Sequence, residues 1–197
     1  MTEQASFTQD MDKFIEAVLY IGERSENDPH FGVSKLTRLL YYSDCAVYML
    51  LGRPITGATY LHFPHGPYPE NWYQARMIME QSGAITVLRD SHAQGYHRYG
   101  LLTNRPANRE MLAAEEMEEM DAQMERFADY SAAAIEDYSQ YEAAWLATED
   151  GQPMSYDLAG WTAPPLSQNS IRHVKEIAKR RAAAGAPADP VGSAGSG

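Results

Sequence analysis

The chain has 197 residues, 44% of them apolar, which is long enough for one domain with a core of its own. Its 27 acidic and 16 basic residues give a formal net charge of −11, which argues against broad attraction to phosphate backbones or anionic lipids. Cys45 is the only cysteine and no apolar run approaches the roughly 20 residues of a membrane-spanning helix, so we expect a cytoplasmic protein without disulfides or membrane contact.

Two amphipathic helices are predicted at the start of the chain. Apolar residues recur with the spacing of one helical face over residues 9–24, and Thr8 is the expected N-cap. A second apolar stripe follows Ser34, another residue type that favours the N-cap, and ends at Gly52. We therefore expect two helices separated by a polar break.

The next segment carries signals for β-structure. Residues 55–63 are rich in β-branched and aromatic side chains, which predicts a short strand. Residues 64–69, PHGPYP, contain three prolines and are expected to form a rigid loop without regular structure. A helix over 70–82 follows, and then a hairpin in which 84–89 and 96–102 flank a polar tip. The order helix, strand, helix, hairpin resembles a winged-helix arrangement.

The longest helical pattern lies in the second half of the chain. It opens near Asn104 and Pro106, reaches Trp145, and is expected to break at 129–131. Residues 110–142 hold 11 carboxylates and one arginine, so the acidity of the chain belongs mostly to this element. Together these signals predict a fold that is mainly α, with a small antiparallel β-sheet or hairpin.

The composition changes twice near the end of the chain. Residues 151–168 are expected to form an irregular connection, and 169–184 a helix with five basic residues. Residues 185–197 are mostly Ala, Gly, Pro and Ser, which cannot bury enough apolar area to offset the entropy of ordering. We expect one domain over residues 1–184 and a disordered tail after it.

The residues that commonly carry catalysis or bind metals show no supporting pattern. His62 and His65 are three residues apart without sharing a helical face, so the spacing of a zinc site is missing. Cys45 is expected in the middle of a helix, where nothing lowers the pKa of its thiol. The chain has no nucleophile elbow, phosphate-binding loop or dinucleotide fingerprint. We expect no enzyme, and no catalytic residue, cofactor or metal ion.

Two features are interpreted as surfaces for a partner. The first is a stiff, aromatic and proline-rich corner, made of His65, Gly66, Pro67, Tyr68 and Trp72. The alternative, that Tyr68 and Trp72 only close the core, stays open. The second is the acidic face that includes Glu115 and Glu119, interpreted as a solvated face that suits a basic partner rather than as a Mg²⁺ site.

A family resemblance extends this interpretation. The segment KLTRLLYYSDCAVYMLLGRPITGATYLHFPHGPYPENWY (35–73) resembles the opening signature of the Panacea domain, the SocA-like antitoxin family. The matching residues are Lys35, Leu36, Leu39, Leu40, Tyr41, Tyr42, Gly52, Pro54, Gly66 and Pro67. Residues 130–148 resemble a second block of that family, which ends in a tryptophan segment. The chain departs at 45–48, where the family commonly has Trp-His, and at 139–141, where it often has Thr-His.

The resemblance implies a small helical protein, with a shared core at about 10–161 and no known catalytic centre. It implies an antitoxin of a bacterial or phage toxin–antitoxin system, which neutralises a cognate toxin encoded nearby by direct binding in the cytoplasm. The assembly expected is a toxin–antitoxin complex or a homo-oligomer. The residues expected to contact the partner are Tyr41, Tyr42, His65, Gly66, Pro67, Tyr68, Trp72, Glu115, Glu119 and Trp145.

Two other functions stay open. A winged-helix DNA-binding regulator would place Arg or Lys on its third helix, where this chain has Arg76 beside Glu70 and Glu80, so binding of nucleic acid is not favoured. A proteolytic adaptor, which delivers a toxin to a protease, would need a second interface. The tail at 185–197 is the candidate for it.

Overall fold

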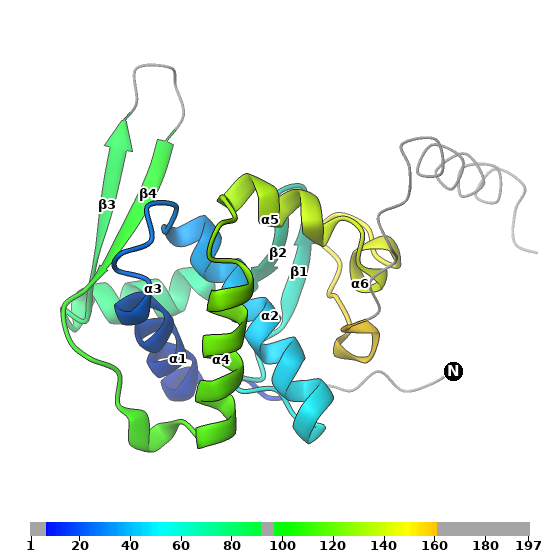
Figure 1. Ribbon diagram of the computed structural model, residues 1–197, viewed down its shortest axis with the longest axis horizontal. Coiled ribbons are helices and arrows are strands. Elements are labelled where there is room, and N and C mark those ends of the chain that lie inside the picture. Colours follow the sequence, from blue (N-terminus) through cyan, green and yellow to red (C-terminus); the bar gives the residue numbers. More distant parts are fainter. Residues whose placement is uncertain (1–6, 92–96, 161–197) are drawn as a thin grey trace, which may run out of the picture. The chain divides into compact units, whose positions relative to one another are not determined.

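Helix α2 is the central element of the computed structural model, which describes residues 7–91 and 97–160. These residues lie within one unit that spans Met1–Ala163. Helix α2 contacts three further helices, α1, α4 and α5, and two strands (Figure 1). The bounds of the helices are α1 Met11–Arg24, α2 Val33–Leu51, α3 Trp72–Gln81, α4 Ala114–Arg126, α5 Ala132–Ser139 and α6 Ala143–Leu146, with short 3₁₀ turns at Arg109–Met111 and Tyr156–Leu158.

The first two helices are present, but the N-cap residue predicted for each of them is wrong. Asp10 caps α1, because its carboxylate accepts a hydrogen bond from the Lys13 amide at 3.0 Å, so Thr8 lies too early. Gly32 occupies the N-cap position of α2, and Ser34 lies inside the first turn. The expected end of α2 is confirmed, since Gly52 has a φ of 71°, the left-handed conformation typical of a residue after a helix.

The proline-rich segment forms a strand, contrary to the expectation of an irregular loop. Strand β2 (Gly66–Pro69) pairs antiparallel with β1 (Tyr60–Phe63), and β1 is shorter than expected. The backbone of β1 bonds to residues 151–154 along its other edge at Tyr60 and His62, the positions paired with Pro69 and Pro67. The prolines therefore stand where no hydrogen bond to β1 is required, and their missing donors cost the pair nothing.

The second hairpin matches its prediction. Strands β3 (Ile85–Ser91) and β4 (His97–Thr103) pair antiparallel and extend away from the helices (Figure 1). Helix α3 ends before Gly83, as expected. Since β1 pairs with β2 and not with this hairpin, the described residues form two separate two-stranded sheets. The predicted class, mainly α with a small antiparallel component, is confirmed, whereas the strand pairing differs from a winged-helix sheet.

The long helical pattern starts later than predicted. Residues 104–113 are not an α-helix because carboxylates of α1 bind their backbone: Glu16 accepts from the Asn108 amide at 2.7 Å and Glu23 from the Ala107 amide at 3.1 Å. The expected break is confirmed, since Ser131 caps α5 through the Ala134 amide. The predictions for 161–168, for the basic helix at 169–184 and for the tail at 185–197 lie outside the described residues.

Two buried carboxylates join the helices to the rest of the core. Asp44 of α2 accepts hydrogen bonds from the Thr56 amide (2.8 Å), the Thr56 hydroxyl (2.5 Å) and the Tyr60 phenol (2.8 Å). Burial nevertheless raises the pKa of Asp44 to about 6. Glu116 of α4 is fully buried and lies 2.7 Å from Lys13 Nζ of α1 and from Arg53 Nη1 after α2.

Gly66 sits where a side chain does not fit. Its φ is 106°, and a Cβ there would lie 3.0 Å from Arg38 Nε and 3.2 Å from Ser139 Oγ. We expect Gly66→Ala to lower the free energy of unfolding by about 3 kcal/mol, since backbone strain and overpacking add. The control is Gly83→Ala, at a φ of 72° with no neighbouring atom within 4 Å, for which strain alone costs about 1 kcal/mol. Urea unfolding measures both, and equal losses would contradict this account.

Candidate partner-binding site

The outer face of α4 is acidic and exposed. Helical spacing places Glu115, Glu118 and Glu125 on one side of the helix, where all three are exposed, and Glu119 is half-buried beside them. We call these four residues the acidic face of α4. None of them forms an ion pair with another residue of the described ranges, whereas Asp121 pairs with Arg24 at 2.6 Å. The acidic face is thus a concentration of negative charge directed at solvent.

The corner at the β1–β2 turn is only partly a surface. The His65 side chain is 80% exposed, with its Nδ1 atom 3.1 Å from Glu136 Oε1 of α5. Tyr68 is half-buried and meets Phe63 edge-on, with ring centroids 6.0 Å apart. The other expected corner residues are buried, namely Gly66, Pro67 and Trp72. Of the five expected residues, His65 and Tyr68 can therefore touch a partner, and the buried three support them.

A buried arginine holds this corner from behind. Arg38 of α2 donates to the Ser34 carbonyl, and its Nη2 atom lies 3.8 Å from Glu136 Oε2. Burial lowers the pKa of Arg38, and the nearby carboxylate opposes that shift. The absence of a Cβ on Gly66 allows the guanidinium to lie directly under the turn. The corner is therefore a preformed element.

Tyr41 and Tyr42 lie at a cavity. Both are buried, with 3% and 5% of their surface exposed, so neither belongs to the outer surface. The cavity has a volume of about 210 Å³ and lies between α2, α4 and the segment that carries Glu142. Its lining consists of Tyr41, Tyr42, Cys45, Ala46, Met49, Gln123, Arg126, Glu142, Ala159 and Gly160.

Glu142 is the buried carboxyl group of this cavity. Burial raises its pKa to about 7, and the nearby phenols of Tyr42 and Tyr41 oppose that shift. Glu142 forms no ion pair within the part of the chain that the structure describes. Burial also raises the pKa of the Cys45 thiol well above its ordinary value, so this cysteine is protonated near neutral pH.

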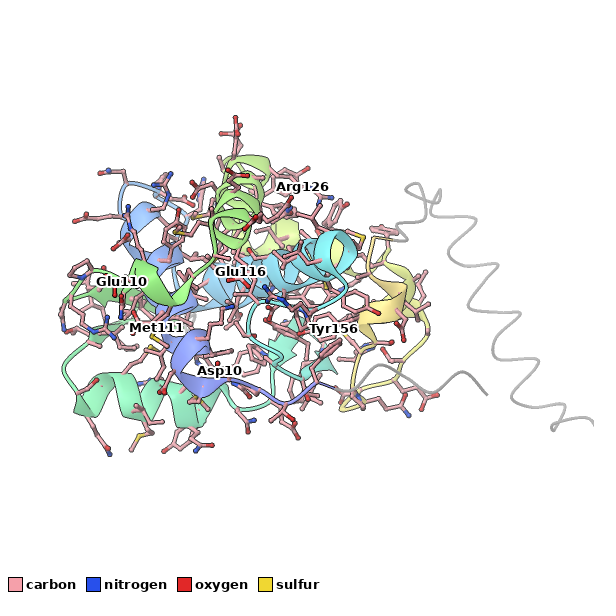
Figure 2. The ribbon with its side chains drawn as sticks, turned by 90° about the horizontal axis from the view of Figure 1, so that it is seen from below. Asp10, Glu110, Met111, Glu116, Arg126 and Tyr156 are labelled. Atoms are coloured by element: carbon pink, nitrogen blue, oxygen red, sulfur yellow. The ribbon has the colours of Figure 1, made fainter. Side chains whose placement is uncertain are left out.

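Arg126 stands beside the cavity near the end of α4 (Figure 2). Its guanidinium lies over the rings of Phe127, Tyr138 and Tyr42, at 4.9, 5.2 and 5.8 Å from their centroids. It donates to the Tyr138 phenol at 2.5 Å and to Gln123 at 3.3 Å. These contacts hold Arg126 on the aromatic rings and more than 4 Å from the Glu142 carboxylate.

Trp145 lies apart from the other expected residues. It is half-buried and stacks on His62 of β1, with ring centroids 3.5 Å apart and planes 27° from parallel. Burial lowers the pKa of His62, which favours the neutral imidazole. Trp145 thus covers the outside of β1.

The ten expected residues therefore occupy four places: the corner, the acidic face of α4, the cavity and the outside of β1. Sequence reasoning missed Arg38, Glu136, Arg126 and Glu142, which position or complete these places. Two of these residues could have been found from the sequence. Arg38 lies one helical turn before Tyr42 on α2, and Glu142 lies just before the tryptophan segment of the second family block.

Neither a metal site nor a membrane-spanning helix is found in the described residues. Over residues 7–91 and 97–160, no group of three or more His, Cys, Asp or Glu side chains is placed to hold a metal ion. None of the helices in those ranges has the length and apolar character needed to traverse a bilayer.

The acidic face of α4 and the preformed corner are carried by a scaffold that is mainly α-helical. Residues 36–146 match the family model described as the antitoxin SocA-like, Panacea domain, and because this match spans more than half of the 197 residues, the chain belongs to that family. The resemblance inferred from 35–73 is thereby confirmed. No curated protein matches the sequence.

The cavity carboxyl group predicts a pH dependence of stability. The folded-state pKa of Glu142, about 7, lies above its ordinary value of 4.5, so its contribution to stability is complete below pH 4.5 and is lost as the pH rises through 7. We compare the free energy of unfolding of Glu142→Gln with that of wild type. As the pH rises from about 4.5 to 8, we expect this difference to shift by about 3 kcal/mol in favour of the variant.

Urea unfolding of both proteins across this range measures the difference. Asp44, whose pKa is also raised, is present in both proteins and cancels. A difference that does not change with pH would show that Glu142 is ionised as readily as in an unfolded chain.

Proposed function

We propose that this protein is an antitoxin that neutralises a cognate toxin by direct protein–protein binding, with the acidic face of α4 as the principal contact. Membership of the SocA-like antitoxin family supports the class of function. The observation that carries the choice of surface is the row of exposed carboxylates on α4, none of them paired with a described residue.

The electrostatics favour a basic partner. Residues 110–142 carry 11 carboxylates and one arginine, so the potential over α4 is strongly negative. Complementary charge speeds the encounter of two proteins more than it strengthens the final complex. An antitoxin benefits from this, because the toxin must be bound before it reaches its target.

The corner supplies a second, less polar contact. His65 and Tyr68 are held by a hairpin with prolines at two of its four β2 positions, so little entropy is lost on binding. The exposed apolar side chains Phe63 and Tyr73 flank this corner in the chain. Aromatic side chains on a rigid support are common anchors of protein interfaces.

The cellular experiment uses the product of the gene adjacent to this one as the candidate toxin. Expression of that product alone should arrest growth, and co-expression with this protein should restore it. The two proteins should then co-purify as a complex. If the adjacent product is harmless alone, or stays toxic while this protein accumulates, the proposed function is wrong.

The role of the acidic face is tested by removing three of its charges. We expect Glu115→Gln, Glu118→Gln and Glu119→Gln together to slow association with the adjacent gene product about tenfold at low ionic strength, because the steering field is weakened. Stopped-flow or surface-binding kinetics measure the rate. The difference should shrink at high salt, where exposed charges are screened.

The matched control removes the same number of charges elsewhere. Glu26, Glu70 and Glu110 are exposed and lie outside α4, so their triple change to Gln alters the net charge equally. We expect that control to keep an association rate close to wild type. Equal slowing by the two triple variants would assign the effect to overall charge and not to the acidic face.

A further inference from the structure

The cavity beside Arg126 has a size and lining that suit one side chain. Its volume of about 210 Å³ is below the roughly 300 Å³ at which pockets for drug-sized ligands begin. The aromatic residues Tyr41 and Tyr42 form one wall. Met49, which is 57% exposed, stands at its edge and offers apolar surface to a group that enters.

The carboxyl group in this cavity lacks the compensation that the other buried carboxylates have. Glu116 is neutralised by two cations at 2.7 Å, and Asp44 accepts hydrogen bonds from Thr56 and Tyr60. Glu142 is only 8% exposed, faces two phenols and forms no ion pair within the described residues. A buried carboxylate without a counter-ion is costly, so a cation that enters the cavity would be bound there.

The walls also favour a cation over an anion. Arg126 already shows that a guanidinium packs well on these rings, since it lies over Tyr42 at 5.8 Å. Tyr138 and Gln123 hold it there, so within the described residues it forms no ion pair with Glu142. The surrounding residues 110–142 add ten further carboxylates, which oppose the entry of any anion.

We propose that the cavity receives the side chain of a lysine or arginine from the partner protein, with its charged head at Glu142 and its aliphatic stem against Tyr42 and Met49. This assignment rests on the proposed function, because it takes the toxin as the partner. It adds a specific anchor to the diffuse attraction of the acidic face, and anchors of this kind set the dissociation rate.

The anchor makes binding depend on pH. Among the described residues, the ionisable groups around Glu142 are Tyr41, Tyr42 and Cys45 from α2 and Arg126 from α4; Tyr138 from α5 lies next to Tyr42, and residues 159–160 add none. A cation stabilises the ionised form of Glu142, so the proton of Glu142 leaves when the partner binds. Affinity should therefore fall as the pH decreases from about 8 to 6.

The first experiment measures binding of the purified product of the adjacent gene to the full chain by titration calorimetry. We expect Glu142→Gln to weaken binding at least tenfold at about pH 8, and to abolish the loss of affinity toward about pH 6 that wild type shows. Glu110→Gln is the matched control, since Glu110 is exposed and lies well apart from Arg126 (Figure 2). It should behave as wild type.

The second experiment tests the cavity without the partner. Butylammonium chloride is titrated into the ¹⁵N-labelled full chain, with butanol as the uncharged control. We expect butylammonium to shift the amide signals of Tyr41, Tyr42 and Gln123 in wild type but not in Glu142→Gln, and butanol to shift neither. Unfolding curves establish that the variant is folded.

The outcomes separate the two proposals. If wild type binds the adjacent product and Glu142→Gln binds it equally with the same pH profile, the cavity proposal is wrong and the proposed function stands. If wild type does not bind the product, the proposed function is wrong, and the assignment to a partner side chain falls with it. Butylammonium shifts that are absent, or equal in both proteins, also overturn the cavity proposal.

Discussion

The arrangement of the helices depends on the need to neutralise one buried carboxylate. Glu116 is fully buried, with Lys13 Nζ and Arg53 Nη1 at 2.7 Å and the Ala113 amide at 2.9 Å. Removing a carboxylate from water costs several kcal/mol unless such partners compensate, so α1, the turn after α2 and the start of α4 must meet at this point. With the inner side of α4 held there, Glu115, Glu118 and Glu125 face outward.

Asp44, Glu116 and Glu142 form a graded series, and the pKa of each reflects its partners. Burial would raise the pKa of Glu116, but hydrogen bonds from Lys13, Ala113 and Arg53 outweigh it and lower the pKa. Asp44, with neutral donors, has a pKa of about 6. Glu142, which faces phenols, has a pKa of about 7. The first two carboxylates are satisfied within the fold, and the third is left for an external cation.

Local patterns predicted the elements that depend on local contacts. The apolar periodicity of α1 and α2, Gly52 at the end of α2, and Ser131 at the start of α5 act within a few residues of themselves, and all are present. The errors arose where residues distant in the sequence determine the local backbone structure. Backbone donors near Asn108 bind carboxylates of α1 and not a helical carbonyl, and the prolines of β2 are tolerated only because β1 directs hydrogen bonds elsewhere.

The same distinction applies to the candidate site. Tyr41 and Tyr42 were identified by resemblance to a family, which carries information that periodicity lacks, and the corner by its prolines and aromatic side chains. Glu142 was missed because its contact with Tyr42 joins residues far apart in the chain. The role of the ten expected residues in binding a partner stays a prediction, but their burial already divides them into those that touch solvent and those that support.

The pairing of β1 on both edges limits self-association of the protein through this sheet. Segment 151–154 covers one edge of β1 and β2 covers the other, so among the described residues the outer edge of β2 is the unpaired edge of this sheet. There Pro67 and Pro69 present no donors, and an intruding chain would find half of its partners missing. The protein can therefore accumulate in excess of whatever it binds without polymerising through this sheet.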